Sequence, residues 1–243
     1  MTPYKALILA AGTGTRMGIL TADKAKPSLE VGGKSLVGRL VQNLTKLQSG
    51  PEEIFVNIHH APMSIIQALD AENHLQDVNF FWEPHLLGSA LTLWSLQQST
   101  NSAILVIHGD LLLSQDTFEY LLCDLEIKSN IPVVYHHYRR AEQARSMITF
   151  DEKYRVRSFN ETPGSIKENV ATNSGIYFFP KGSLNRLSKP SYGESVAVRT
   201  MLDLVRHRSL LTSPIRGAFR ASIETSEGLL SARKFYHGNK QLF

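Results

Sequence analysis

The chain has 243 residues, of which 42% are hydrophobic and 20% are charged, a balance that excludes a disordered segment or a low-complexity tail. Its 26 Lys and Arg residues against 22 Asp and Glu residues give a formal net charge of +4. This charge suits an anionic small molecule as well as a nucleic acid, and the single cysteine, Cys123, excludes an internal disulfide and a cysteine-based metal cage.

A buried strand is the first predicted element, over residues 6–11. It is a continuous apolar run, which is typical of strands that are buried on both faces of a parallel sheet. About seven apolar residues are too few for a signal peptide or a membrane span, so we expect a cytoplasmic protein without a membrane partner. The run ends at a glycine-rich segment, residues 12–18.

Strand-like and helix-like segments alternate up to residue 130. Continuous apolar runs predict strands over residues 54–58, 78–82 and 103–107. Apolar residues at spacings of three and four predict helices over residues 37–47, 64–71 and 86–98. The alternation predicts an α/β fold, in which a mixed, mostly parallel sheet is flanked by helices.

The second half of the chain is richer in predicted strands, at residues 133–138, 147–150, 155–159 and 175–179. Helices are predicted over residues 195–207 and 226–236. Because no linker rich in Pro, Gly or Ser interrupts the chain, we expect one domain over residues 1–243 with a smaller β-rich part in its second half. Trp82 and Trp94 are expected in the core.

Two polar segments follow buried strands and are expected to meet at one edge of the sheet. They are the glycine-rich segment 12–18 and the pair Gly109 and Asp110. Glycines after a strand let backbone N–H groups approach a phosphate closely, and Arg16 and Lys26 could neutralise a triphosphate. On the alternative interpretation, the segment is only a tight turn and the two cations are solvated.

The spacing excludes two other phosphate-binding motifs. A dinucleotide-binding fingerprint needs a third glycine where this chain has Met17. A P-loop that ends at residues 33–35 needs its first glycine where this chain has Ser28.

The motifs together resemble the sugar-1-phosphate nucleotidylyltransferases, a family of NTP transferases, and in particular its short, stand-alone bacterial members. The resemblance rests on residues 9–17, 26–27, 31–36, 83–84, 87–90, 109–110, 159–163, 173–177 and 223–232. It covers most of the chain and implies a Rossmann-like nucleotidyltransferase fold. The implied reaction is NTP plus sugar 1-phosphate giving NDP-sugar plus pyrophosphate, with Mg²⁺ as the cofactor.

The resemblance also implies roles for the residues at matching positions. Base and ribose would contact Leu9, Ala11, Gly12, Glu83 and Gly88. The departing phosphates would contact Gly14, Thr15 and Arg16. Lys26 would bridge the α-phosphate and the sugar phosphate, and Asp110 would ligate Mg²⁺. Sugar hydroxyls would be held by Glu161 and Asn173.

The chain departs from the family pattern at three positions. Ser222 stands where the family carries a second metal-binding Asp; Glu224 could replace that Asp only if the strand end shifts. Thr162 replaces a lysine expected at the sugar phosphate, for which Lys167 could substitute, and Ser146 replaces a glycine. These departures motivate a second hypothesis, a catalytically impaired nucleotide- or sugar-nucleotide-binding regulator or partner subunit.

The remaining expectations concern organisation and partners. Residues 1–130 are expected to form the nucleotide-binding half and residues 131–243 the sugar-phosphate-binding half. NTP and a sugar 1-phosphate are the expected partners. Nucleic acid is not expected, because Arg139 and Arg140 lack a larger basic patch around them. A homo-oligomer is compatible with the sequence, which does not specify the oligomeric state.

Overall fold

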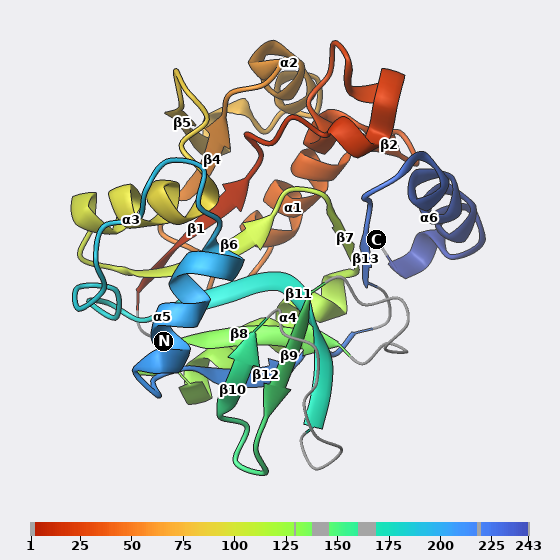
Figure 1. The fold of residues 1–243 in the computed structure, drawn as a ribbon. Helices are drawn as coiled ribbons and strands as arrows, with labels where there is room; N and C mark the ends of the chain where they lie inside the picture. Colours follow the sequence, from red (N-terminus) through yellow and green to blue (C-terminus); the bar gives the residue numbers. More distant parts are fainter. Residues whose placement is uncertain (1–2, 129, 138–145, 160–168, 218–219, 243) are drawn as a thin grey trace.

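The computed structural model describes residues 3–128, 130–137, 146–159, 169–217 and 220–242 (Figure 1). Within these residues the main sheet has nine strands, and seven of them lie in the order β10-β9-β11-β6-β1-β4-β5, with β8 pairing with β11 and β12. The strands are β1 Tyr4–Leu9, β4 Ile54–Ile58, β5 Val78–Trp82, β6 Ala103–His108, β8 Val133–His137, β9 Met147–Phe150, β10 Val156–Phe159, β11 Asn169–Phe179 and β12 Leu211–Pro214.

The centre of the sheet is parallel, since β1 pairs in parallel with both β4 and β6, and β4 with β5. The long strand β11 runs antiparallel to β6, β8 and β9 and joins the parallel part to the strands of the second half. Its pairing with β8 shifts register between Asn173 and Tyr177. The predicted fold, a mixed and mostly parallel sheet with flanking helices, is confirmed.

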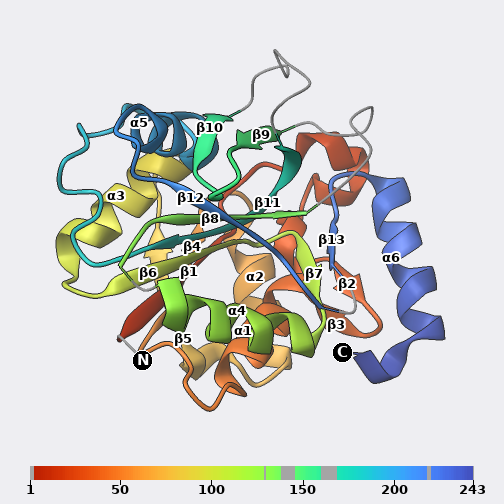
Figure 2. The ribbon, with the colours of Figure 1, turned by 90° about the horizontal axis from the view of Figure 1, so that it is seen from below.

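Helices cover both faces of the sheet, with α1, α2 and α4 on one side and α3 and α5 on the other (Figure 2). Alternating residues of β1 therefore enter different cores: Ala6 and Ile8 pack with α1, and Leu7 packs with α3. The helices are α1 Leu36–Thr45, α2 Pro62–Ala71, α3 Ser89–Ser99, α4 Gln115–Lys128, α5 Met201–Arg206 and α6 Ser226–Gly238.

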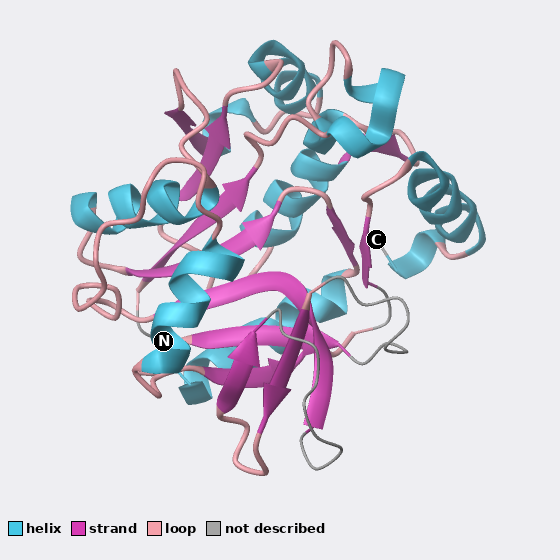
Figure 3. Ribbon diagram, viewed as in Figure 1, coloured by secondary structure: helices cyan, strands magenta, loops and turns pink. Residues whose placement is uncertain are grey.

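A third apolar cluster ties the C-terminal segment to the glycine-rich segment near the N-terminus. Met17, Leu112 and Leu229 belong to it. The short strand β13 (Arg220–Ser222) pairs with β7 (Leu111–Leu113), and α6 packs on the hairpin of β2 (Glu30–Val31) and β3 (Lys34–Ser35) (Figures 1 and 3). Residues more than 200 positions apart are thus brought to one side of the molecule.

The structure corrects one expectation about the core. Trp82 is 58% exposed, because β5 is an edge strand and this residue lies at its end. In the described part of the chain, no helix is long and apolar enough to cross a membrane.

Candidate active site

A cleft of about 320 Å³ opens where β1, β4 and β6 end. Eight residues that the sequence singled out line it together: Leu9, Ala11, Gly12, Arg16, Lys26, Glu83, Gly88 and Asp110. The expected convergence of the glycine-rich segment with Asp110 at one edge of the sheet is therefore observed.

The ends of β1 and β6 approach each other closely at Gly109. A Cβ atom there would lie 2.8 Å from the carbonyl oxygen of Leu9, closer than real Cβ atoms come. The Gly109 N–H donates to the same carbonyl at 2.9 Å. Glycine thus allows the turn after β6, which carries Asp110, to lie directly beside the end of β1.

The glycine-rich segment turns into a short 3₁₀ helix over Thr15–Thr21. Gly14 begins this turn with φ +65°, a conformation that favours glycine. The buried Thr21 hydroxyl donates to the Gly14 carbonyl at 2.9 Å, which closes the turn. Gly14 and Thr15 directly precede Arg16, which lines the cleft.

Two ion pairs lie around the cleft. Lys26 pairs with Asp110, and both side chains are largely buried. Arg16 pairs with Glu224, and this pair is more exposed. Two positive and two negative charges cancel, so a bound triphosphate would bring negative charge that these four side chains alone do not compensate.

The opposite wall of the cleft is held by the buried carboxylate of Glu83. It accepts hydrogen bonds from Asn57 Nδ2 at 2.7 Å, from Thr92 Oγ1 at 2.6 Å and from the Leu87 N–H at 3.0 Å. Asn57 Oδ1 in turn accepts from the N–H groups of Ala10 and Ala11, at 2.6 and 3.3 Å. Glu83 is therefore bonded directly to the backbone at Leu87 and, through Asn57, to the backbone at Ala10 and Ala11.

Asn57 and His108 also line the cleft, although neither was predicted as a site residue. Asn57 interrupts the otherwise apolar strand β4, and that polar residue near a strand end was a usable signal. His108 is the last residue of β6, and its ring centre lies 5.7 Å from that of Tyr177.

The C-terminal segment approaches Asp110 through its backbone. The Ile223 N–H donates to the Asp110 carbonyl at 2.9 Å, in continuation of the β7–β13 pairing. The Glu224 side chain binds Arg16 and lies 3.5 Å from the Ser222 hydroxyl. Glu224 thus enters the site as the partner of a cation.

The residues expected at the sugar lie apart from this cleft or outside the described residues. Asn173 Nδ2 donates to the Tyr177 hydroxyl at 2.7 Å, and its Oδ1 accepts from the Gly175 N–H at 3.0 Å. Asn173 is not among the residues that line the cleft, while its N–H donates to the Ser146 carbonyl at 2.9 Å. Glu161, Thr162 and Lys167 lie outside the described residues.

The histidines of the His59–His60 pair have separate partners. His59 Nδ1 lies 2.8 Å from the Glu83 carbonyl, and His60 Nε2 lies 2.8 Å from the Thr21 carbonyl. No group of three His, Cys, Asp or Glu side chains suited to a metal ion occurs among the residues that the structure describes.

Comparison with known proteins agrees with this geometry. Residues 5–210 match the model of the family described as nucleotidyl transferase. The crystal structure of HddC from Yersinia pseudotuberculosis has the same fold, with a TM-score of 0.74 and 21% identity over 96% of this chain and 99% of that one.

Curated relatives are named as nucleotidyltransferases or as the bifunctional protein GlmU. GlmU of Methanocaldococcus jannaschii is 23% identical over 202 residues, 83% of this chain and 46% of that protein. The N-acetylmuramate alpha-1-phosphate uridylyltransferase of Neisseria meningitidis is 35% identical over 116 residues, 46% of this chain and 49% of that protein. The chain spans about half the length of these two relatives.

A third relative has a length closer to that of this chain. The UTP–glucose-1-phosphate uridylyltransferase AglF of Haloferax volcanii is 23% identical over 204 residues, 83% of both chains. Because the family model covers far more than half of the chain, the family assignment does not depend on any one relative. The chain belongs to the nucleotidyl transferase family.

Proposed function

We propose that this nucleotidyltransferase moves the nucleotidyl group of an NTP onto a sugar 1-phosphate and releases pyrophosphate. The observation that carries the proposal is the position of Lys26 and Asp110, an ion pair of largely buried side chains that lines the cleft beside the glycine-rich segment. The names of relatives such as AglF, which include glucose-1-phosphate, support a sugar phosphate as the acceptor.

The proposed reaction needs no general base. The sugar phosphate is already an anion, and one of its oxygens attacks the α-phosphorus of the NTP while the bond to the β-phosphate breaks. The new P–O bond gives the NDP-sugar, and pyrophosphate leaves with the electron pair of the broken bond. Catalysis then consists of holding two anions together in line and balancing their charge.

Residues of the cleft divide this task by their chemistry. The Lys26 ammonium is a compact charge that would contact the α-phosphate and the attacking phosphate. The Arg16 guanidinium, with the N–H groups around Gly14 and Thr15, would hold the phosphates that leave. Leu9, Ala11 and Gly12 would contact the base, with Glu83 and Gly88 near the base and ribose.

A divalent cation fits the donor set of the cleft, and we propose Mg²⁺. The Asp110 carboxylate offers hard oxygen ligands, and Mg²⁺ in proteins is commonly held by one or two carboxylates plus substrate phosphates. Glu224 is a second candidate ligand if the triphosphate takes its place on Arg16. The bound cation would supply the positive charge that the four paired side chains lack.

We further propose that the two halves of the chain divide the substrates. Residues 1–130 would bind the nucleotide and residues 131–243 the sugar phosphate, for which Glu161, Lys167 and Asn173 remain the candidates. Most residues that line the cleft belong to the first half, which supports the nucleotide part of this division. The curated relatives are named as enzymes, so the comparisons do not favour the alternative of a catalytically impaired binding protein.

The experiment is an activity screen of the purified chain. Each of four NTPs is combined with Mg²⁺ and a panel of sugar 1-phosphates, and pyrophosphate release is followed. We expect release with at least one pair, dependent on the acceptor, and its loss in Asp110→Asn but not in the control Asp70→Asn, which removes an exposed charge on α2. Well-folded protein that binds NTP but releases no pyrophosphate with any acceptor would overturn the proposal.

A further inference from the structure

The segment between β11 and α5 reaches the cleft. Residues 188–196, here called the strap, include Gly193, which lines the cleft. The Gly193 N–H donates to the Leu87 carbonyl at 2.8 Å, and the Ala90 N–H donates to the Glu194 carbonyl at 3.0 Å. The strap therefore lies directly on the turn that contains Gly88.

The contact between the strap and this turn leaves no room for a side chain. Gly88 has φ +85°, and a Cβ atom there would lie 2.6 Å from the Glu194 carbonyl oxygen and from the Gly193 carbonyl carbon. Backbone thus packs against backbone. A shift of the strap would move Gly193 and Gly88, which both line the cleft.

The strap has little regular structure and few apolar anchors of its own. Residues 188–195 lie outside helices and strands, and Tyr192 is 74% exposed. Pro190 is buried, beside a cavity of about 10 Å³ that leaves room for roughly one water molecule and for no larger ligand. Polar contacts must therefore hold much of the strap in place.

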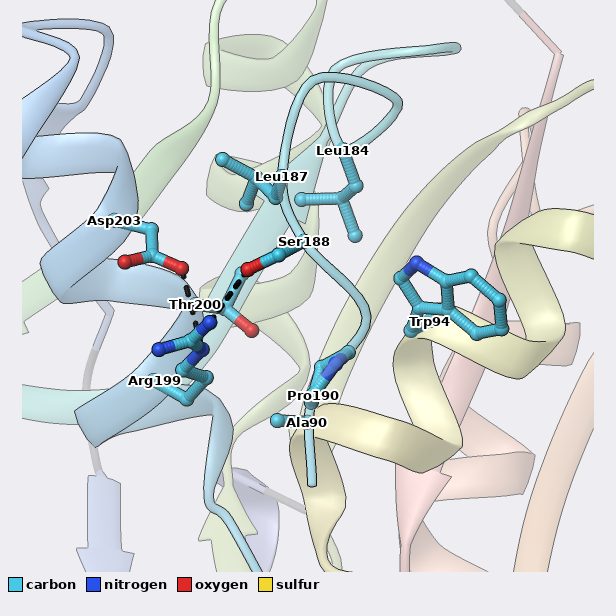
Figure 4. Close-up of a pocket in the computed structure, with 9 residues that line it drawn as sticks. All are labelled: Ala90, Trp94, Leu184, Leu187, Ser188, Pro190, Arg199, Thr200 and Asp203. Atoms are coloured by element: carbon cyan, nitrogen blue, oxygen red, sulfur yellow. Dashed lines mark hydrogen bonds and ion pairs between the residues drawn. The ribbon is translucent and has the colours of Figure 1, made fainter. Parts of the chain in front are cut away.

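Besides the backbone bonds and the bond from the Val196 N–H to the Ser89 hydroxyl, at 2.9 Å, Arg199 makes polar contacts to the strap from the π-helical turn Val196–Thr200 (Figure 4). Its Nη2 donates to the Ser188 hydroxyl at 2.5 Å, at the start of the strap. Its Nε lies 3.8 Å from the Glu194 carboxylate, near the end of the strap, and 3.3 Å from the Asp203 carboxylate on α5. One guanidinium group thus joins both ends of the strap to the helix.

We infer that Arg199 is a positioning residue that holds the strap against the Gly88 turn and so fixes the nucleoside side of the cleft. The inference rests on the proposed function for the identity of the ligand. It does not need Arg199 to contact the nucleotide. An arginine suits this role because its planar fork donates in several fixed directions at once, which a lysine cannot do.

The test compares three variants. Arg199→Met keeps the apolar stem but removes the donors, and Arg199→Lys restores the charge without the fork. Arg206→Met is the matched control, since Arg206 also pairs with Asp203, at 3.1 Å, while it is Arg199 that contacts Ser188 and Glu194 of the strap. For Arg199→Met we expect KM for the NTP to rise about three- to tenfold, with kcat and KM for the acceptor little changed. Arg199→Lys should recover part of the loss, and Arg206→Met should resemble the wild type.

Hydrogen exchange on the ligand-free protein gives a second readout that needs no turnover. In Arg199→Met the amides of Gly193 and Ala90 should exchange faster, while those of β6 stay protected as in the wild type. Unchanged exchange at these two amides, or an equal effect of Arg206→Met, would overturn the inference. If no substrate pair reacts but the exchange changes as expected, the proposed function fails and the positioning role stands.

Discussion

Replacing Asn57 by alanine tests whether the wall of the cleft depends on one buried amide. The change removes the acceptor of the Ala10 and Ala11 N–H groups and one of the donors to Glu83. Asn57 is only 3% exposed, so these partners lose hydrogen bonds in a confined place. Water from the cleft can replace part of what is lost, because all four residues line the cleft.

The expected loss of stability follows from the number of hydrogen bonds that Asn57→Ala removes. Each of the two short bonds, at 2.6 and 2.7 Å, contributes about 1 kcal/mol, and an unsatisfied buried partner adds about 1–3 kcal/mol where water does not reach it. We therefore expect the free energy of unfolding to fall by about 2–4 kcal/mol. Thr92→Val removes a hydroxyl that donates to Glu83 and also lies 3.2 Å from the Gly88 carbonyl oxygen, and should cost less, about 1–2 kcal/mol.

Urea denaturation of the two variants and the wild type measures these differences. NTP affinity, measured by calorimetry under conditions where each variant is folded, should fall more in Asn57→Ala than in Thr92→Val. A loss below about 0.5 kcal/mol in Asn57→Ala, the range of an ordinary surface substitution, would refute the reasoning.

Three further predictions concern other parts of the structure. Gly109→Ala forces a Cβ atom to 2.8 Å from the Leu9 carbonyl oxygen, so the free energy of unfolding, measured by heat or urea, should fall by about 1–3 kcal/mol. Unchanged stability would contradict the close approach. Burial lowers the pKa of His136 to about 4 from 6.5, so the unfolded chain binds the proton first and about 3 kcal/mol of stability is lost as pH falls from 6.5 to 4. Urea midpoints at pH 7 and 4.5 should show a smaller loss in His136→Gln than in the wild type, and equal losses would contradict the assignment. Glu224→Gln removes the carboxylate that pairs with Arg16, so the affinity for NTP without divalent metal, measured by calorimetry, should rise about two- to fivefold. The nearby control Glu227→Gln should change this affinity little, and equal effects of the two variants would contradict a specific pair.

The first half of the fold was predictable because its strands are short apolar runs and its helices carry regularly spaced apolar residues. Strands β4 and β5 were predicted at their observed bounds, and α1, α2 and β6 within about two residues. Strands β12 and β13 were not predicted. Strand β13 has three residues and β12 contains Thr, Ser and Pro, so neither carries an apolar pattern, and both form through partners distant in sequence.

The candidate site, like the fold, was predictable from the sequence only in part. Arg16 and Asp110 were found because each lies in a segment that follows a buried strand, and Lys26 because it is a second cation near that segment and matches the family pattern. The pairing of Arg16 with Glu224 spans 208 positions and depends on the packing of β13 and α6, which no local pattern specifies. The role of the strap was likewise not predictable from the sequence, since it arises from backbone contacts with the Gly88 turn.

The central claim is that Lys26 and Asp110 act directly on the reacting phosphates. The most direct measurement is the rate of acceptor-dependent pyrophosphate release by Lys26→Met and Asp110→Asn, with Lys46→Met as a control that removes an exposed cation after α1. We expect each site variant to lose about 100-fold or more in kcat while it stays folded, and the control to match the wild type. Site variants that release pyrophosphate at near wild-type rates would contradict the account.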